Sequence, residues 1–121
     1  MDKSNDTNVI EVTTTDEWNA VVSEFPVVIV DCFALWCMPC KMMTPVFKDL
    51  ASANASRSVA FVKVDIEKAH ESIVKLLDVT ALPSFRVIYK QQVVKNSDFT
   101  LTGGDRKVLS EIVSRAKALP M

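Results

Sequence analysis

The sequence predicts an α/β fold in which a central mixed β-sheet of about five strands is flanked by four helices. Residues 27–30 form an unbroken β-branched run, which is typical of a strand covered by helices on both faces. Segments with helical periodicity alternate with such apolar runs along the chain. The last two extended segments follow each other closely, as in an antiparallel hairpin, and this makes the predicted sheet mixed.

Each element has a local signal. We expect strands over residues 9–12, 27–30, 59–64, 85–89 and 93–99, and helices over residues 16–25, 39–54, 68–77 and 105–118. Thr14 or Thr15 can cap the first helix, and Pro45 should kink the second helix because it clashes with the carbonyl four residues back. Met42 and Met43 are assigned to the apolar core face of that helix. This order of elements puts helices on both faces of the sheet.

Length and composition limit the number of domains and the kinds of partner. The 121 residues suit one domain, which we place at residues 9–118 after a flexible tail over residues 1–8. A formal net charge of −1 gives no electrostatic reason to expect nucleic acid or a membrane surface as partner. The tail is polar and lacks the apolar stretch of a secretory signal, so we expect a cytoplasmic monomer. Three cysteines are an odd number, which argues against a structural disulfide framework.

The sequence Trp36-Cys37-Met38-Pro39-Cys40 falls where the buried strand meets the second helix. Two cysteines three residues apart at a helix start are close enough to form a disulfide. The helix N-terminus favours an anion, so the pKa of the first thiol should be lowered. We therefore expect Cys37 to be an exposed nucleophile and Cys40, one turn deeper and screened from solvent, to be the resolving thiol.

Other roles for this pair have less support. The two cysteines could be buried structural residues or half of a zinc site, but zinc needs two more ligands. Only Cys32 and His70 remain, and neither has ligand spacing to a partner. We therefore expect no metal and no cofactor, and we expect Cys32 to be an inert buried thiol.

Three separated segments resemble the thioredoxin family: VDCFALWCMPCK at residues 30–41, FVKVD at residues 61–65 and VTALPSF at residues 79–85. The resemblance extends over about residues 9–118, with the three segments in the family's order. It implies the thioredoxin fold and a thiol–disulfide oxidoreductase that reduces protein disulfides. It also implies two kinds of partner, namely disulfide-containing protein substrates and an electron donor like thioredoxin reductase.

The resemblance also assigns residues to the site. Asp31 matches the family's buried acid, which can exchange a proton with Cys40 because burial raises its pKa. Lys63 matches the lysine neighbour of that acid. Asp31 could instead be a strand-end residue that caps a turn, and Lys63 a solvated strand residue. The resemblance further implies that Leu82-Pro83 is a cis peptide that faces the redox pair.

Five residues are expected to contact substrate, namely Trp36, Met38, Pro39, Leu82 and Pro83. Met38 departs from the family pattern, in which glycine is usual. An extended substrate could pair with the Leu82 backbone as an added strand, which would not depend on the substrate's side chains.

The final hairpin is a second departure from the family pattern. Gln92 occupies a position where the family usually has glycine, and a non-glycine residue would strain a turn that needs positive φ. Residues 95–98 also make this region longer than usual, which leaves the geometry of the last two strands open.

A binding module is the alternative to an enzyme. In that case the domain would serve as an adaptor or structural subunit whose cysteines are not used catalytically. The secretory-pathway oxidases and isomerases are a further alternative, disfavoured because they tend to carry histidine at the position of Pro39. The presence of Asp31, both cysteines and Pro83 together favours the enzyme.

Overall fold

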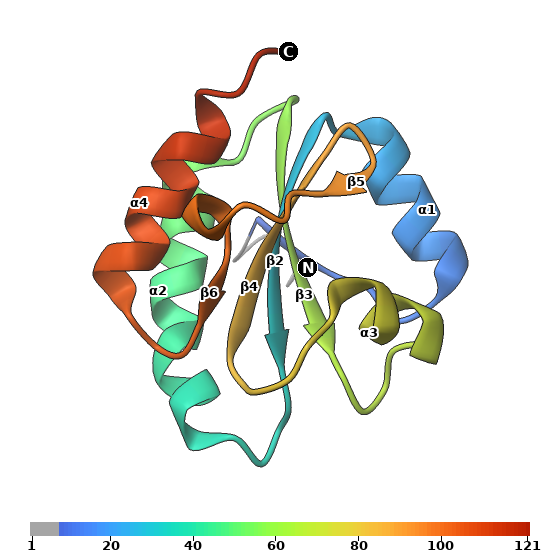
Figure 1. The fold of residues 1–121 in the computed structure, drawn as a ribbon, viewed down its shortest axis with the longest axis vertical. Coiled ribbons are helices and arrows are strands. Elements are labelled where there is room, and N and C mark those ends of the chain that lie inside the picture. The colour runs from blue at the N-terminus through green and yellow to red at the C-terminus, as the bar shows by residue number, and fades with distance from the viewer. Residues whose placement is uncertain (1–7) are drawn as a thin grey trace, which may run out of the picture.

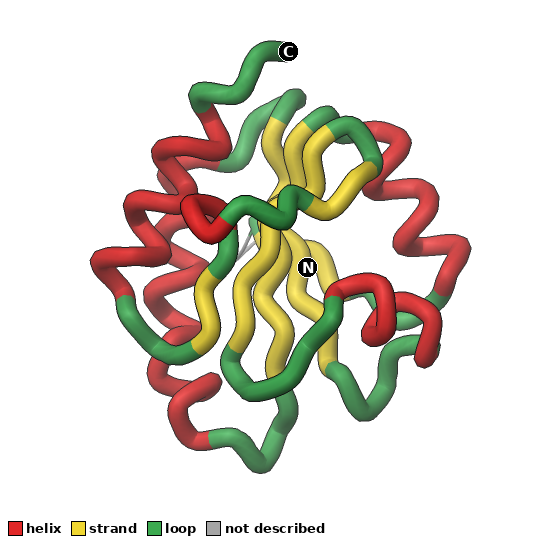
Figure 2. Tube along the Cα trace, in the orientation of Figure 1, coloured by secondary structure: helices red, strands yellow, loops and turns green. Residues whose placement is uncertain are grey.

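The computed structural model describes residues 8–121, so the expected tail lies outside the described residues except for Asn8. The strands are β1 (Val9–Glu11), β2 (Val27–Phe33), β3 (Val59–Asp65), β4 (Ser84–Tyr89), β5 (Gln92–Val93) and β6 (Leu101–Thr102). The helices are α1 (Thr15–Glu24), α2 (Met38–Asn54), α3 (Glu71–Leu77) and α4 (Arg106–Lys117), with a short 3₁₀ helix, η2 (Ser97–Phe99). Figures 1 and 2 show these elements in one orientation.

The sheet is mixed, as predicted. Its order is β1-β3-β2-β4-β5, and β6 pairs with the other part of β4. β1 and β2 both run parallel to β3, whereas β4, β5 and β6 form the antiparallel side of the sheet. Six strands are present in the described residues instead of about five, because β6 (Leu101–Thr102) follows the last predicted strand as a separate strand.

Helices cover both faces of the sheet. Figure 1 shows α2 and α4 on one side and α1 and α3 on the other. Successive side chains of a strand point to opposite faces, so β2 contributes to both cores. Val28, Val30 and Cys32 pack in the core beneath α1 and α3, and Val27 and Ile29 pack in the core beneath α2 and α4. This double burial explains the β-branched run in the sequence.

Aromatic packing fixes α2 on the sheet. Phe47 of α2 is fully buried, and its ring centroid lies 5.4 Å from that of Phe61 in an edge-on contact. A second ring, Phe85 of β4, lies 6.0 Å from Phe47. These rings join the middle of α2 to the strands on either side of β2 and so hold the helix against the sheet.

Two element boundaries differ from the prediction by three residues. β2 continues to Phe33, three residues beyond the β-branched run. The third helix begins at Glu71 instead of residue 68, because residues 66–69 turn around Asp65, whose carbonyl accepts hydrogen bonds from the amides of Lys68 and Ala69. His70 then caps α3 by accepting a hydrogen bond from the amide of Ser72 at 3.1 Å.

The predicted strand over residues 93–99 is wrong beyond Val93. There the chain leaves β5 and enters η2, which Asn96 caps by accepting the Asp98 amide at 2.8 Å. Asn, Ser and Asp compete with strand pairing by bonding to their own backbone, and they cluster in residues 96–98. Pairing resumes only at Leu101 in β6.

The strained turn of the final hairpin lies one residue before the predicted position. Lys90 and Gln91 have positive φ values of 49° and 71°, whereas Gln92 lies in β5. Positive φ at both central residues is the property of a type I′ turn, which matches the twist of the strands that it joins. The cost of a side chain in this conformation therefore falls on Lys90 and Gln91.

Gln91→Gly is expected to raise the free energy of unfolding by about 0.5–1 kcal/mol, because glycine adopts positive φ without steric cost. Gln92→Gly is the matched control and should lower it by a similar amount, about 0.5–1 kcal/mol, since this residue is in a strand. Urea denaturation of both variants measures the difference. Stabilisation by Gln92→Gly and not by Gln91→Gly would contradict this assignment of the turn.

Candidate active site

The two cysteines of the C-x-x-C motif lie at the N-terminus of α2 and are joined by a disulfide, with Cα atoms 5.3 Å apart. Cys37 is the N-cap residue of α2, and its sulfur accepts a hydrogen bond from the Cys40 amide at 3.2 Å. The Cys37 amide donates to the Ala34 carbonyl at 3.2 Å and closes the turn that leads from β2 into α2. Pro39 lies in the first turn of the helix, where its missing N–H costs no hydrogen bond.

The expected contrast in exposure between the two thiols is wrong for the disulfide form. Cys37 is 4% exposed and Cys40 is 3% exposed. The bond holds both sulfur atoms in one small apolar cluster with Ala34, against which Ile66 and Leu82 pack. What distinguishes the two cysteines in this form is position on the helix, because only Cys37 has its sulfur at the cap.

Exposed apolar side chains surround this buried pair. Trp36 is 65% exposed, and Leu35 and Met38 are also largely exposed. Met42 belongs to the same surface at 74% exposed, so its assignment to the core is wrong, whereas its neighbour Met43 is buried as expected. Met38 and Met42 are four residues apart and therefore share one face of α2, next to the disulfide.

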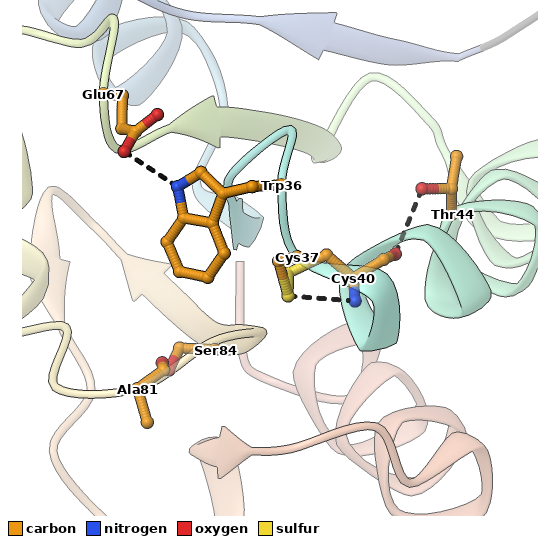
Figure 3. Close-up of a disulfide and its surroundings, with 7 residues drawn as sticks. All are labelled: Trp36, Cys37, Cys40, Thr44, Glu67, Ala81 and Ser84. Atoms are coloured by element: carbon orange, nitrogen blue, oxygen red, sulfur yellow. Dashed lines mark hydrogen bonds between the residues drawn. A yellow bond between two sulfur atoms is a disulfide. The ribbon is translucent and has the colours of Figure 1, made fainter.

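Trp36 has a fixed partner that the sequence reasoning missed. Its indole nitrogen donates to a carboxylate oxygen of Glu67 at 2.8 Å, as Figure 3 shows beside the disulfide. Glu67 follows β3, whose turn is itself held by the Asp65 carboxylate accepting the Glu67 amide at 2.9 Å. The only sequence signal for this contact was the position of an acidic residue just after a strand that ends at the same edge as β2.

The Leu82-Pro83 peptide bond is cis, as the family resemblance implied. Leu82 contacts the cluster that contains both cysteines, and Pro83 is buried at the start of β4. The Pro83 carbonyl accepts a hydrogen bond from the Gly103 amide at 2.8 Å, which ties this segment to the end of β6. The structure therefore brings Leu82, in the segment before β4, into contact with the redox pair, which follows β2.

Asp31 is a buried carboxyl group with an unsatisfied oxygen. It lies in β2 next to Lys63 of β3, but within the described part of the chain no ion pair inside 4.0 Å joins them, and Oδ1 has no hydrogen-bond partner. Burial raises the pKa of Asp31 from its ordinary 3.8 to about 7, and the nearby charge of Lys63 opposes this only in part. Asp31 also lines a cavity of about 260 Å³ with Thr44 and Lys48 of α2.

Thr44 connects this cavity to the redox pair, since its hydroxyl donates to the Cys40 carbonyl at 3.2 Å. Cys32, the third cysteine, is a free and fully buried thiol. Burial raises the pKa of Cys32 to about 12, the negative charge of Asp31 adds to this, and the positive charge of Arg86 lowers it. Cys32 therefore stays protonated near neutral pH, in agreement with the expectation of an inert thiol.

Residues 8–121 contain neither a metal-binding cluster nor a membrane-spanning helix. Among them, no three or more His, Cys, Asp or Glu side chains are grouped as they would be around a metal ion. Within the same range, no helix is both long and apolar enough to cross a bilayer.

A disulfide between C-x-x-C cysteines at a helix N-terminus, with a cis-proline segment against it, defines the site of a thiol–disulfide oxidoreductase. Residues 9–114 match the family model described as Thioredoxin. The chain belongs to the thioredoxin family. It is 31% identical to "Thioredoxin 1" of Plasmodium falciparum over 107 residues, which cover 88% of this chain and 96% of that protein.

Other relatives are longer than this chain. It is 36% identical to "Thioredoxin-like protein 1" of Schizosaccharomyces pombe and 31% identical to "Thioredoxin F, chloroplastic" of Oryza sativa, but it spans only 35% and 56% of their lengths. Among solved structures, the thioredoxin of Malassezia sympodialis is similar with a TM-score of 0.81 at 28% identity, covering 93% of both chains. The thioredoxin fold predicted from the sequence is confirmed.

Burial of Asp31 predicts how the free energy of unfolding depends on pH. Its folded-state pKa is raised, so the stability of the folded chain is highest with a neutral carboxyl below about pH 4 and is lost as pH rises through about 7. Asp31→Asn removes this loss, so the variant should exceed the original chain in unfolding free energy by an amount that grows between these pH values to the order of 4 kcal/mol. Urea denaturation of the oxidised proteins at pH 4, 5.5, 7 and 8 would measure it.

Asp49→Asn is the matched control, because Asp49 is an exposed acid on α2. The free energy of unfolding of Asp49→Asn should differ little from that of the original chain, and by nearly the same amount at each pH. A flat difference for Asp31→Asn as well would show that Asp31 ionises without cost in the folded protein.

Proposed function

We propose that this chain reduces disulfide bonds of protein substrates through a cycle in which Cys37 is the nucleophile and Cys40 the resolving thiol. The observation that supports these roles best is the hydrogen bond from the Cys40 amide to the Cys37 sulfur at the cap of α2. In the reduced protein the same amide and the helix dipole favour a Cys37 thiolate, and the thiolate is the reactive form.

The cycle consists of two displacements. The Cys37 thiolate attacks one sulfur of the substrate disulfide, that bond breaks, and the other substrate sulfur leaves as a thiol after taking a proton. Cys40 loses its proton and attacks the Cys37 sulfur, which releases the second substrate sulfur and forms the Cys37–Cys40 disulfide. Two electrons pass from the dithiol to the substrate, the two protons that Cys37 and Cys40 give up balance the two that the substrate thiols take up, and the disulfide form described above is the product.

Asp31 is proposed to accept the proton that Cys40 must lose. A pKa of about 7 is supported by burial and allows the carboxyl to take up and release a proton near neutral pH. Lys63 lies opposite Asp31 on β3, and its charge keeps the carboxyl from being protonated permanently. Asp31 shares a cavity with Thr44, whose hydroxyl donates to the Cys40 carbonyl.

Substrates are proposed to meet the disulfide across an apolar rim. Trp36, Met38 and Pro39 supply it from the α2 side, and half-buried Leu82 supplies it from the β4 side, next to Pro83, which is buried. Exposed Trp and Met side chains suit varied partners, since Met adapts its shape and Trp contributes a large apolar area. An extended substrate segment can pair with the backbone at Leu82 as an added strand, which places its disulfide near Cys37.

The proposed electron donor is a reductase like thioredoxin reductase, since a dithiol must be regenerated after each cycle. We further propose that the chain acts as a monomer in the cytoplasm, with no nucleic acid or membrane as partner. The low net charge supports the absence of nucleic-acid binding. The relatives are found in more than one compartment, because they include a chloroplastic thioredoxin F and the mitochondrial thioredoxin 3 of Saccharomyces cerevisiae.

Reduction of insulin with dithiothreitol as electron source tests the proposed function. The chain should accelerate precipitation of the insulin B chain, and Cys37→Ser should abolish this acceleration because it removes the attacking sulfur. Cys32→Ser is the matched control and should retain most of the activity, since Cys32 is a protonated thiol outside the redox pair. Equal rates with and without the Cys37 sulfur would favour the adaptor instead.

Asp31→Asn is expected to slow insulin reduction at pH 7 by about tenfold or more, because the amide cannot accept the proton of Cys40. The deficit should shrink as pH rises, since hydroxide then removes that proton without the carboxyl. Single-turnover oxidation of the reduced protein by insulin between pH 6 and 9 measures this. Asp49→Asn again serves as control, and an unchanged rate for Asp31→Asn at pH 7 would leave Asp31 without a role in proton transfer.

A further inference from the structure

Arg86 is a buried cation that is bound only by main-chain carbonyls among the described residues. It lies in β4 at 7% exposed and is the only charged residue of that strand. Its guanidinium donates to the carbonyls of Leu77 at 2.9 Å, Asp78 at 3.1 Å and Phe85 at 3.0 Å, and more weakly to that of Leu101 at 3.5 Å. Burying a charge is costly unless its donors are satisfied, so this arrangement calls for a reason.

Two of these carbonyls belong to the end of α3. Leu77 is the last residue of the helix, and Asp78 follows it in the left-handed conformation with φ of 54°. The last carbonyls of a helix have no partner within the helix and carry its negative dipole end. Arg86 satisfies both of them with one planar group, and it thereby fixes the point at which residues 78–83 begin.

A second side chain on the same face of β4 holds the same segment. Ser84 precedes Arg86 by two residues, so both point to one face of the strand. The Ser84 hydroxyl donates to the Ala81 carbonyl, and Figure 3 shows these two residues together. Residues 78–83 are therefore attached to β4 by Arg86 at their start and by Ser84 near their end, and Leu82 between these points contacts the cysteine cluster.

We propose that Arg86 is a positioning residue for protein substrates: it holds residues 78–83 so that the Leu82 backbone stands at the correct distance from the Cys37 sulfur. This proposal rests on the proposed function, because it concerns the same site. Arginine suits the task better than lysine, since a rigid fork can bind several carbonyls at once. A displacement of about 1 Å in such a segment can lower reactivity on the order of a hundredfold.

Comparing a protein substrate with a small disulfide separates an effect on the position of residues 78–83 from an effect on the stability of the fold. A protein substrate needs the Leu82 backbone and the Cys37 sulfur together, whereas a small aromatic disulfide such as 5,5′-dithiobis(2-nitrobenzoate) needs only access to the sulfur. A variant that is only less stable keeps both rates at a temperature well below its unfolding transition. A variant with a displaced segment loses the reaction with protein and keeps the reaction with the small disulfide.

The experiment compares Arg86→Met, Arg86→Lys and the exposed-residue control Arg57→Met with the original chain. Arg86→Met should raise KM for insulin by about tenfold or more, while the rate constant with the small disulfide stays within about twofold. Arg86→Lys should fall between, because one ammonium group cannot reach all of the carbonyls. Arg57→Met should leave both reactions unchanged. If Arg86→Met does not fold, Arg86→Lys supplies the comparison.

Amide hydrogen exchange of residues 78–83 gives a readout that does not depend on activity. Exchange in this segment should be faster in Arg86→Lys than in the original chain, with β2 and β3 unchanged. Unchanged exchange and an unchanged KM for insulin would overturn the proposal, and so would equal losses with insulin and the small disulfide. Failure of the original chain to reduce insulin would instead refute the proposed function and would leave the exchange measurement to decide on Arg86.

Discussion

Burial of β2 on both faces is the constraint on which the rest of the site depends. Its side chains alternate between the two cores, so a one-residue shift in register would bring every one of them to the wrong face. Pairing with β3 on one side and β4 on the other fixes where the strand ends, and the turn at residues 34–37 therefore starts α2 at a defined point. The same burial deprives Asp31 of water and so raises its pKa to about 7, the value on which the proposed proton transfer relies.

Most of the fold and the redox pair could be predicted because their signals are local. The β-branched run marks β2, the C-x-x-C spacing marks the disulfide, and helical periodicity marks the helices. The cis conformation at Pro83 was inferred from the family resemblance, with support from its place between a helix and a strand, since a cis peptide is uncommon even before proline. The last strand was mispredicted because Asn96 satisfies the backbone locally, a preference that competes with β-branched residues nearby.

The residues that the sequence reasoning missed act across the fold. Glu67 meets Trp36 over a separation of 31 residues, and Arg86 meets Leu101 over 15 residues, so no local pattern reports either contact. The sequence nevertheless contains one signal for Arg86, which is the only charged residue of its strand. Met42 shows the opposite limit: two adjacent methionines fit the apolar pattern equally well, and only the rotation of α2 on the sheet decides which of them is buried.

The replacement of the last predicted strand by η2 also affects how the sheet ends. β1 has three residues at one edge, and β5 and β6 have two each at the other, separated by η2. Short edge strands offer few aligned amides and carbonyls, so misfolded chains find little template for cross-β growth. The proposed pairing of an extended substrate with the Leu82 backbone would be exposed to that hazard whenever the substrate is aggregation-prone. Short edge strands would confine such pairing to the segment beside the disulfide, where the proposed cycle ends with release of the reduced substrate.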